Sequence, residues 1–209
     1  MGVVVQKYGG TSVGSVEKIQ NVARKIAGRY RETNRIVVVV SAMSGETDKL
    51  LKLAREMSKK PDPRELAVMV STGEQVSVSL LAMALKDLGV PARSLLAHQI
   101  GIFTDNAFTR ARIQTIELDM LKKVLENGEV AVVAGFQGIT RGGDVTTLGR
   151  GGSDTTAAIL GLALKAEAVE IYTDVDGVMT ADPRLLPEAR VIPDVSYSEV
   201  FQMADHGAK

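Results

Sequence analysis

The sequence predicts an α/β fold, a three-layer sandwich with helices on both faces of a mostly parallel central sheet. Short valine-rich runs recur at residues 3–5, 36–40, 130–134 and 169–172, with amphipathic stretches between them. This alternation is typical of βα units that build a parallel sheet buried on both faces. Glycine-rich segments directly follow several of these runs, and such segments lie at the carboxyl ends of parallel strands, where open sheets bind ligands.

The composition narrows the possible functions before any motif is considered. The chain has 209 residues with 25 Lys or Arg and 25 Asp or Glu, so its formal charge is zero and neither nucleic acid nor an anionic membrane is an expected partner. It contains no cysteine and two histidines, His98 and His206, so we expect no protein-built metal site. No apolar run approaches about 18 residues. We therefore expect one soluble, cytoplasmic domain over residues 1–209.

Helical periodicity separates the strands in the first half of the chain. Apolar residues at 19, 22, 23 and 26 form one stripe after Ser15, which predicts an N-capped helix that ends near Tyr30. A second helix is predicted from Thr47 to Met57, and prolines at 61 and 63 stop it. A third runs from residue 64 to 88, is interrupted at Gly73 and is ended by Gly89.

The second half continues the same alternation. We expect one helix over residues 106–127 and another over 153–165, the latter rich in alanine and leucine. Residues 137–148 contain two β-prone arms around Gly142-Gly143-Asp144, which predicts a hairpin.

The first glycine-rich segment, residues 7–12, reads Lys-Tyr-Gly-Gly-Thr-Ser. Its glycines allow close approach of the backbone to a phosphate, and Lys7 adds a positive charge on the preceding strand. The alternative is an ordinary βα turn.

The second segment, residues 149–154, reads Gly-Arg-Gly-Gly-Ser-Asp and opens a helix. Free amides at a helix N-terminus next to Arg150 suit an anion such as a phosphate or carboxylate. A capped helix with a surface arginine is the alternative. Asp154 stands where a dinucleotide fingerprint needs a small residue, and no P-loop motif is present, so neither of those sites is predicted.

Two further segments are candidate ligand sites. Residues 172–184 carry several acidic residues around Gly177, but their spacing does not match a calcium loop, and a nucleotide-holding loop fits better. Glu74 lies in a polar interruption between apolar residues; it either faces solvent or meets a cation such as a substrate amine, because an unpaired buried charge is costly.

Together these motifs resemble aspartate kinase, of the amino acid kinase superfamily. The resemblance spans the whole chain, with seven motifs in the family's order: residues 7–12, 41–43, 72–74, 135–136, 147–154, 173–177 and 182–184. It implies the amino acid kinase fold. It also implies phosphorylation of the β-carboxylate of L-aspartate by ATP, the first step toward lysine, threonine and methionine.

The resemblance assigns roles to individual residues. Lys7 is the expected catalytic cation, oriented by Asp154, while Arg150 takes a substrate carboxylate and Glu74 takes the α-ammonium. The aspartate pocket is expected to include Ser41, Thr47, Phe136, Gly151, Gly152 and Ser153. The nucleotide is expected to contact Lys7, Tyr8, Gly9, Gly10, Thr173, Asp174, Met179, Arg184 and Lys209. Magnesium is expected on the ATP phosphates and waters, and the sequence identifies no protein ligand for it.

The same resemblance leaves three matters as expectations. Aspartate kinases continue past the motif that ends at Lys209 into further kinase elements and paired ACT domains, so this chain is expected to be a C-terminally truncated catalytic domain. The full-length protein is expected to be a homo-oligomer or to work with an ACT-containing regulatory subunit. A catalytically weak nucleotide-binding fragment, or another kinase of the superfamily acting on acetylglutamate, glutamate or uridylate, remains the alternative.

Overall fold

A computed structural model describes residues 2–33, 35–175 and 177–206 of the chain. The chain separates into two compact units, Met1–Thr173 and Asp174–Lys209, and each is described by itself.

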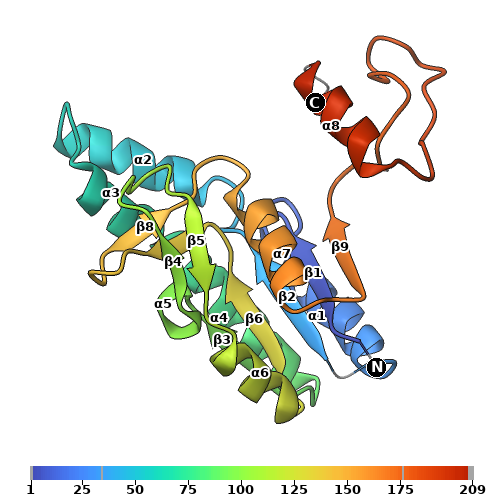
Figure 1. Cartoon of the computed structure of the whole chain (residues 1–209), viewed down its shortest axis with the longest axis horizontal. Helices are drawn as coiled ribbons and strands as arrows, with labels where there is room; N and C mark the ends of the chain where they lie inside the picture. The colour runs from blue at the N-terminus through green and yellow to red at the C-terminus, as the bar shows by residue number, and fades with distance from the viewer. Residues whose placement is uncertain (1, 34, 176, 207–209) are drawn as a thin grey trace. The chain divides into compact units, whose positions relative to one another are not determined.

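A five-stranded sheet forms the centre of the first unit (Figure 1). Neighbouring strands of this sheet pair in parallel, so the α/β class with a parallel sheet is confirmed. Its strands in spatial order are β3 (Ala92–Leu95), β6 (Val130–Ala134), β2 (Ile36–Val40), β1 (Val4–Tyr8) and β9 (Ala168–Tyr172).

Helices cover both faces of this sheet because its inner strands β6 and β2 are apolar at every position. In β2, Ile36, Val38 and Val40 face one core, shared with α1 (Val16–Tyr30) and α4 (Thr72–Asp87). The intervening residues Val37 and Val39 face the other core. That second core is shared with α5 (Ala97–Ile100), α6 (Asp119–Glu126) and α7 (Gly152–Ala163). The three-layer sandwich follows from this double burial.

A second, four-stranded sheet was not predicted as such. Its order is β5 (Ile113–Ile116), β4 (Ile102–Thr104), β7 (Gln137–Ile139) and β8 (Val145–Thr147). The pair of β7 and β8 is the expected hairpin, with antiparallel register from Gln137 opposite Thr147 to Ile139 opposite Val145.

The predicted helix over residues 106–127 is wrong in its first half. Residues 113–116 form β5, which pairs antiparallel with β4, and the helix there is only Asp119–Glu126. Ile113, Thr115 and Ile116 are β-branched, so they favour a strand once a partner strand is available. The apolar spacing also fits a helix, but pairing with β4 makes this segment a strand.

The other predicted helices begin and end close to where local signals predict, whereas α5 and α8 were not predicted. The Ser15 hydroxyl accepts a hydrogen bond from the Lys18 N–H and caps α1. Helix α2 is Glu46–Met57. The long third helix is divided into α3 (Pro63–Val70) and α4, with the break at Ser71, two residues before Gly73.

The stretch Pro63–Asp87 is long and apolar enough to cross a membrane by length and composition alone. Half of the most apolar 18-residue segment of this stretch is buried inside the fold. Its residues Val78, Leu81 and Leu85 are fully buried in the core next to the sheet, an environment typical of the core helix of a globular domain.

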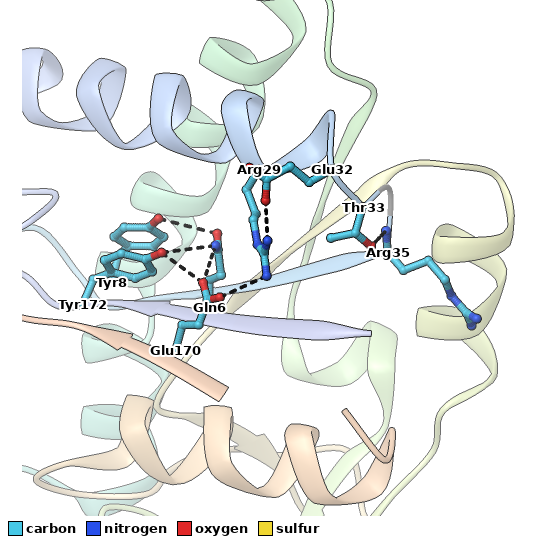
Figure 2. A network of polar contacts seen from close by, with 8 residues as sticks. All are labelled: Gln6, Tyr8, Arg29, Glu32, Thr33, Arg35, Glu170 and Tyr172. Atoms are coloured by element: carbon cyan, nitrogen blue, oxygen red, sulfur yellow. Dashed lines mark hydrogen bonds and ion pairs between the residues drawn. The ribbon is translucent and has the colours of Figure 1, made fainter. Parts of the chain in front are cut away.

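A polar network joins the edge strand β9 to β1 and α1 (Figure 2). Glu170 accepts hydrogen bonds from Gln6 Nε2 at 2.7 Å and from the Tyr172 hydroxyl at 2.9 Å, and Arg29 of α1 lies 3.5 Å from it. The Tyr172 ring stacks on that of Tyr8, with centroids 4.6 Å apart. The run 169–172 is therefore a strand, but the expectation that both its faces are buried is wrong, because Val169 is 39% and Ile171 52% exposed.

The second unit contains little regular structure. Its helix α8 (Tyr197–Asp205) begins with a capping box, in which Ser196 and Glu199 bind each other's backbone N–H. Met179 and Val191 form an isolated antiparallel bridge.

Candidate active site

The loops at the carboxyl ends of the central strands enclose a cavity of about 230 Å³ in the first unit. It collects segments that are far apart in the sequence: the loop after β2, the first turn of α4, the turn after β6, and the N-terminus of α7. Its lining residues are Ser41, Ala42, Thr47, Glu74, Phe136, Gly149, Arg150, Gly151, Gly152, Ser153 and Asp154. Every residue expected in the aspartate pocket thus lines one cavity.

Glu74 is the most unusual residue of this cavity. It lies in the first turn of α4 and is 3% exposed. Its Oε1 accepts a hydrogen bond from the Ala42 N–H at 3.2 Å, while Oε2 is buried without a hydrogen-bond partner. Burial raises the pKa of its carboxyl to about 7, although the backbone N–H groups of Glu74 and Ala42 act in the opposite direction.

The alternative prediction, that Glu74 faces solvent, is therefore wrong. A buried carboxylate with one unsatisfied oxygen costs free energy unless a cation or donor meets it. The side chain lines the cavity, so a ligand there can supply that donor.

The cavity also holds a positive element. Helix α7 begins after Gly151, which adopts a left-handed φ of 74° and has no side-chain cap. The first backbone N–H groups of a helix carry a partial positive charge. Arg150 is exposed at the same rim, so the guanidinium and the α7 N-terminus together favour an anion.

Lys7 and Asp154 meet next to this cavity. Lys7 Nζ lies 2.8 Å from Asp154 Oδ1; the lysine side chain is 11% exposed and the aspartate 46%. Asp154 lies in the first turn of α7, so the pair ties β1 to the helix that also carries Gly152 and Ser153. The expectation that Asp154 orients Lys7 remains a proposal, and this contact supports it.

The glycines after β1 permit close packing of three loops. A Cβ on Gly10 would lie 2.9 Å from the Ala42 carbonyl oxygen, and one on Gly73 would lie 2.8 Å from the Ala42 Cβ. Gly9 is beside the Lys7 ammonium, which would be 3.5 Å from an added Cβ. The backbone of this loop is therefore next to both Lys7 and the cavity wall.

Tyr8 was expected among the nucleotide contacts. Its side chain is 1% exposed and stacks on Tyr172 on the α1 side of the sheet, and burial raises the pKa of its hydroxyl. Lys7 points to the opposite face, so only the Tyr8 backbone is available to a ligand near Lys7.

The remaining nucleotide candidates belong to different parts of the chain. Thr173 ends the first unit, while Asp174, Met179 and Arg184 belong to the second. Arg184 forms a bidentate pair with Asp182, at 3.0 and 2.7 Å, which lowers the pKa of that aspartate to about 2. Thr173 therefore shares a unit with Lys7 and directly follows β9, the strand that pairs with β1, whereas Asp174, Met179 and Arg184 do not belong to that unit. Lys209 lies outside the described residues.

Two cavity residues, Ala42 and Gly149, were not predicted as site residues. Ala42 contributes its backbone N–H to Glu74, a role that no side-chain pattern signals. Among the described residues, no three or more His, Asp or Glu side chains gather as a metal-binding group.

Comparison with known proteins places the chain in a family. Residues 2–209 match the Amino acid kinase family, and the chain belongs to that family. An aspartokinase from Pseudomonas aeruginosa is 54% identical over 210 residues, and one from Thermus thermophilus is 50% identical over 209. Each alignment covers 100% of this chain but only 51% and 52% of the relative, so the chain spans about half the length of these curated relatives.

Solved structures give the same result. An aspartate kinase from Synechocystis superposes with a TM-score of 0.84 at 47% identity, covering 99% of this chain and 34% of that one. Aspartokinase III from E. coli, in complex with aspartate and ADP, has a TM-score of 0.83 at 28% identity and covers 99% and 57%. The predicted amino acid kinase fold is thereby confirmed.

Proposed function

We propose that this chain transfers the γ-phosphoryl group of ATP to the β-carboxylate of L-aspartate, giving 4-phospho-L-aspartate and ADP. The observation that carries the proposal is the buried Glu74 carboxylate, with its unpaired Oε2, in the same small cavity as Arg150. An amino acid ligand presents both an ammonium and a carboxylate, so it matches a cavity that offers the acidic Glu74 and the basic Arg150. The similarity to aspartokinases supports aspartate as that amino acid.

The two charges fix an orientation for the substrate. In this proposal Glu74 accepts the α-ammonium and Arg150 binds the α-carboxylate in a bidentate contact. The β-carboxylate is then free to face Lys7 and the N-terminus of α7. Ser41, Thr47, Phe136 and Ser153 complete the pocket around the carbon chain.

Phosphorylation of a carboxylate needs no general base. The β-carboxylate is already ionised at neutral pH, and one of its oxygens attacks the γ-phosphorus while the bond to the β-phosphate oxygen breaks. Catalysis is then positioning and stabilisation of negative charge. Lys7 and the N–H groups of Gly9 and Gly10 would neutralise the charge that moves onto the ADP oxygen.

ATP is the proposed donor because the E. coli neighbour was solved with ADP. We propose that magnesium arrives bound to the ATP phosphates and would offset part of their negative charge. Thr173, Asp174, Met179, Arg184 and Lys209 remain the proposed contacts for the adenosine and phosphates.

The wider context of the enzyme is also a proposal. The activity would supply an activated aspartate for lysine, threonine and methionine synthesis in the cytoplasm. The greater length of the relatives leaves room for ACT domains, through which the whole protein would oligomerise and respond to an end product.

Trapping the product with hydroxylamine tests this function. The chain is incubated with ATP, magnesium and L-aspartate, and we expect aspartyl hydroxamate and ADP in equal amounts. D-aspartate, L-glutamate, N-acetyl-L-glutamate and UMP serve as comparison substrates. Nucleotide-induced stabilisation without hydroxamate would indicate a binding module, and turnover with another acceptor would identify a different kinase of the family.

A further inference from the structure

Phe136, which lines the cavity, has a backbone conformation that its side chain disfavours. Its φ is 71°, in the left-handed region, and the turn that it forms joins β6 to β7. Among the described residues, Lys165 is the other non-glycine residue with positive φ. A bulky residue stays in this region only when its surroundings fix it there.

The hydrogen bonds of Phe136 show what fixes it. Its N–H donates to the Thr156 hydroxyl at 3.2 Å, and its carbonyl accepts from the Leu148 N–H at 2.9 Å. The Thr156 hydroxyl in turn donates to the Gly152 carbonyl at 2.8 Å. Because an N–H can only donate, Thr156 uses its proton toward Gly152 and a lone pair toward Phe136.

The Thr156 hydroxyl that binds Phe136 lies inside the fold, because Thr156 is 0% exposed. The next residue is held separately, because Gln137 Nε2 donates to the Ser71 carbonyl at 2.6 Å. The turn is therefore held on two sides, by Thr156 in the second turn of α7 and by the Ser71 carbonyl at the break between α3 and α4.

The conformation of Phe136 controls the shape of the cavity wall. A Cβ on Gly152 would lie 2.9 Å from Phe136 Cδ2, and a Cβ on Gly135 would lie 2.7 Å from the Ser153 side chain. The turn and the start of α7 are therefore in direct contact: Phe136 lies against Gly152, and Ser153 lies against Gly135. Because the Phe136 ring lies against Gly152, and both residues line the cavity, a change in the Phe136 backbone would change this part of the cavity wall.

We propose that Thr156 is a positioning residue for the amino acid pocket: its hydroxyl locks Phe136 in the left-handed conformation and so fixes the pocket wall at the N-terminus of α7. Thr156 is not itself among the residues that line the cavity. It acts through Phe136 and Gly152. The kinetic part of this proposal rests on the proposed function, while the structural part does not.

The neighbouring Thr155 provides a matched control. Its hydroxyl donates to the Gly151 carbonyl at 3.2 Å, the same type of bond to the residue four positions earlier, but Thr155 is exposed and does not contact Phe136. Thr155→Val and Thr156→Val remove the same group from adjacent positions of one helix. Thr156→Ser keeps the hydroxyl and removes only a methyl group.

The kinetic test compares the three variants in the 209-residue chain. We expect Thr156→Val to raise the KM for L-aspartate about tenfold, the effect of losing one buried hydrogen bond, with the KM for ATP within about twofold of the parent. Thr156→Ser should restore the aspartate KM, and Thr155→Val should leave it unchanged. Equal behaviour of the two valine variants, or an equal rise in both KM values, would overturn the proposal.

A spectroscopic test does not depend on activity. The chain has four phenylalanines, so labelling with fluorophenylalanine gives four ¹⁹F signals, and Phe136→Leu assigns the relevant one. We expect that signal to shift or broaden in Thr156→Val but not in Thr155→Val or Thr156→Ser. An unchanged Phe136 signal in Thr156→Val would overturn the positioning role, even if the chain phosphorylates another acceptor. If the ¹⁹F signals change as expected but aspartate is not phosphorylated, the result counts against the proposed function alone.

Discussion

Glu74→Gln should have opposite effects on stability and on substrate binding. The substitution keeps the oxygen that accepts from the Ala42 N–H and removes the charge from a side chain that is 3% exposed. In the unliganded protein that charge is unfavourable, because burial raises the carboxyl pKa from 4.5 to about 7. In the aspartate complex the same charge would pair with the α-ammonium.

The pKa shift sets the size and the pH window of the stability effect. Below about pH 4 the carboxyl is protonated in both the folded and unfolded states, so it contributes no difference. Between 4.5 and about 7 the unfolded chain ionises first, and the free energy of unfolding of the parent falls as pH rises. At about 1.4 kcal/mol per pKa unit, the loss is about 3 kcal/mol at pH 8. Glu74→Gln avoids this loss.

Thermal unfolding across pH measures this effect directly. Without ligand, we expect Glu74→Gln to match the parent near pH 4 and to unfold about 6 to 12 °C higher at pH 8. Glu56→Gln is the control, because Glu56 is on the surface of α2 with a side chain 59% exposed, and it should follow the parent throughout. A Glu74→Gln variant that is equally or less stable at pH 8 would refute the buried, unpaired carboxylate.

Substrate binding should change in the other direction. Losing a charge-assisted contact to the ammonium corresponds to about a tenfold to hundredfold rise in the aspartate KM, while stabilisation by ATP stays unchanged. Because the free carboxyl has a pKa of about 7, aspartate binding to the parent at pH 6 should release nearly one proton, and at pH 8.5 almost none. Calorimetry in buffers of different ionisation enthalpy counts that proton. Unaltered aspartate affinity in Glu74→Gln, or no proton release at pH 6, would remove Glu74 from the amine site.

Three other substitutions test the remaining charges. Arg150→Ala should raise the aspartate KM much more than the ATP KM, by an amount equal to about 1.5 to 3 kcal/mol of lost bidentate contact; equal rises would place Arg150 on the nucleotide. Lys7→Met should lower kcat with little change in the aspartate KM, because its charge is needed mainly in the transition state; near-normal kcat would exclude it from catalysis. Asp154→Asn keeps shape but loses the ion pair with Lys7 at 2.8 Å, so kcat should fall less than in Lys7→Met, and a larger fall would give Asp154 a role of its own.

The sequence predicted the parts of the fold that short-range patterns determine. The uninterrupted apolar run of β2 could lie only in a sheet covered on both faces, and Ser15 marked the start of α1. The strand β5 was missed because Ile113 and Ile116 fit a helical spacing as well as a strand, and only pairing with β4 decides between them. Local signals cannot report a partner that lies elsewhere in the fold.

The site was predicted to a similar extent. The glycine-rich segments placed Lys7, Arg150 and Asp154 near one another, because carboxyl-terminal loops of parallel strands meet at one edge. The burial of Glu74 remained open between two readings, since it depends on how closely Ala42 and Gly73 approach each other. The left-handed Phe136 and the buried Thr156 hydroxyl that binds its N–H have no sequence signal, since both result from tertiary packing.

Identification of the phosphorylated carboxylate tests the central claim most directly. The chain is incubated with ATP, magnesium and L-aspartate, and the acyl phosphate is reduced with borohydride to the corresponding alcohol. If Glu74 and Arg150 hold the α-ammonium and α-carboxylate and present the β-carboxylate to Lys7, the product is homoserine. Recovery of 3-amino-4-hydroxybutanoate would show that the α-carboxylate was phosphorylated and that the orientation is reversed, and recovery of unchanged aspartate alone would contradict the activity.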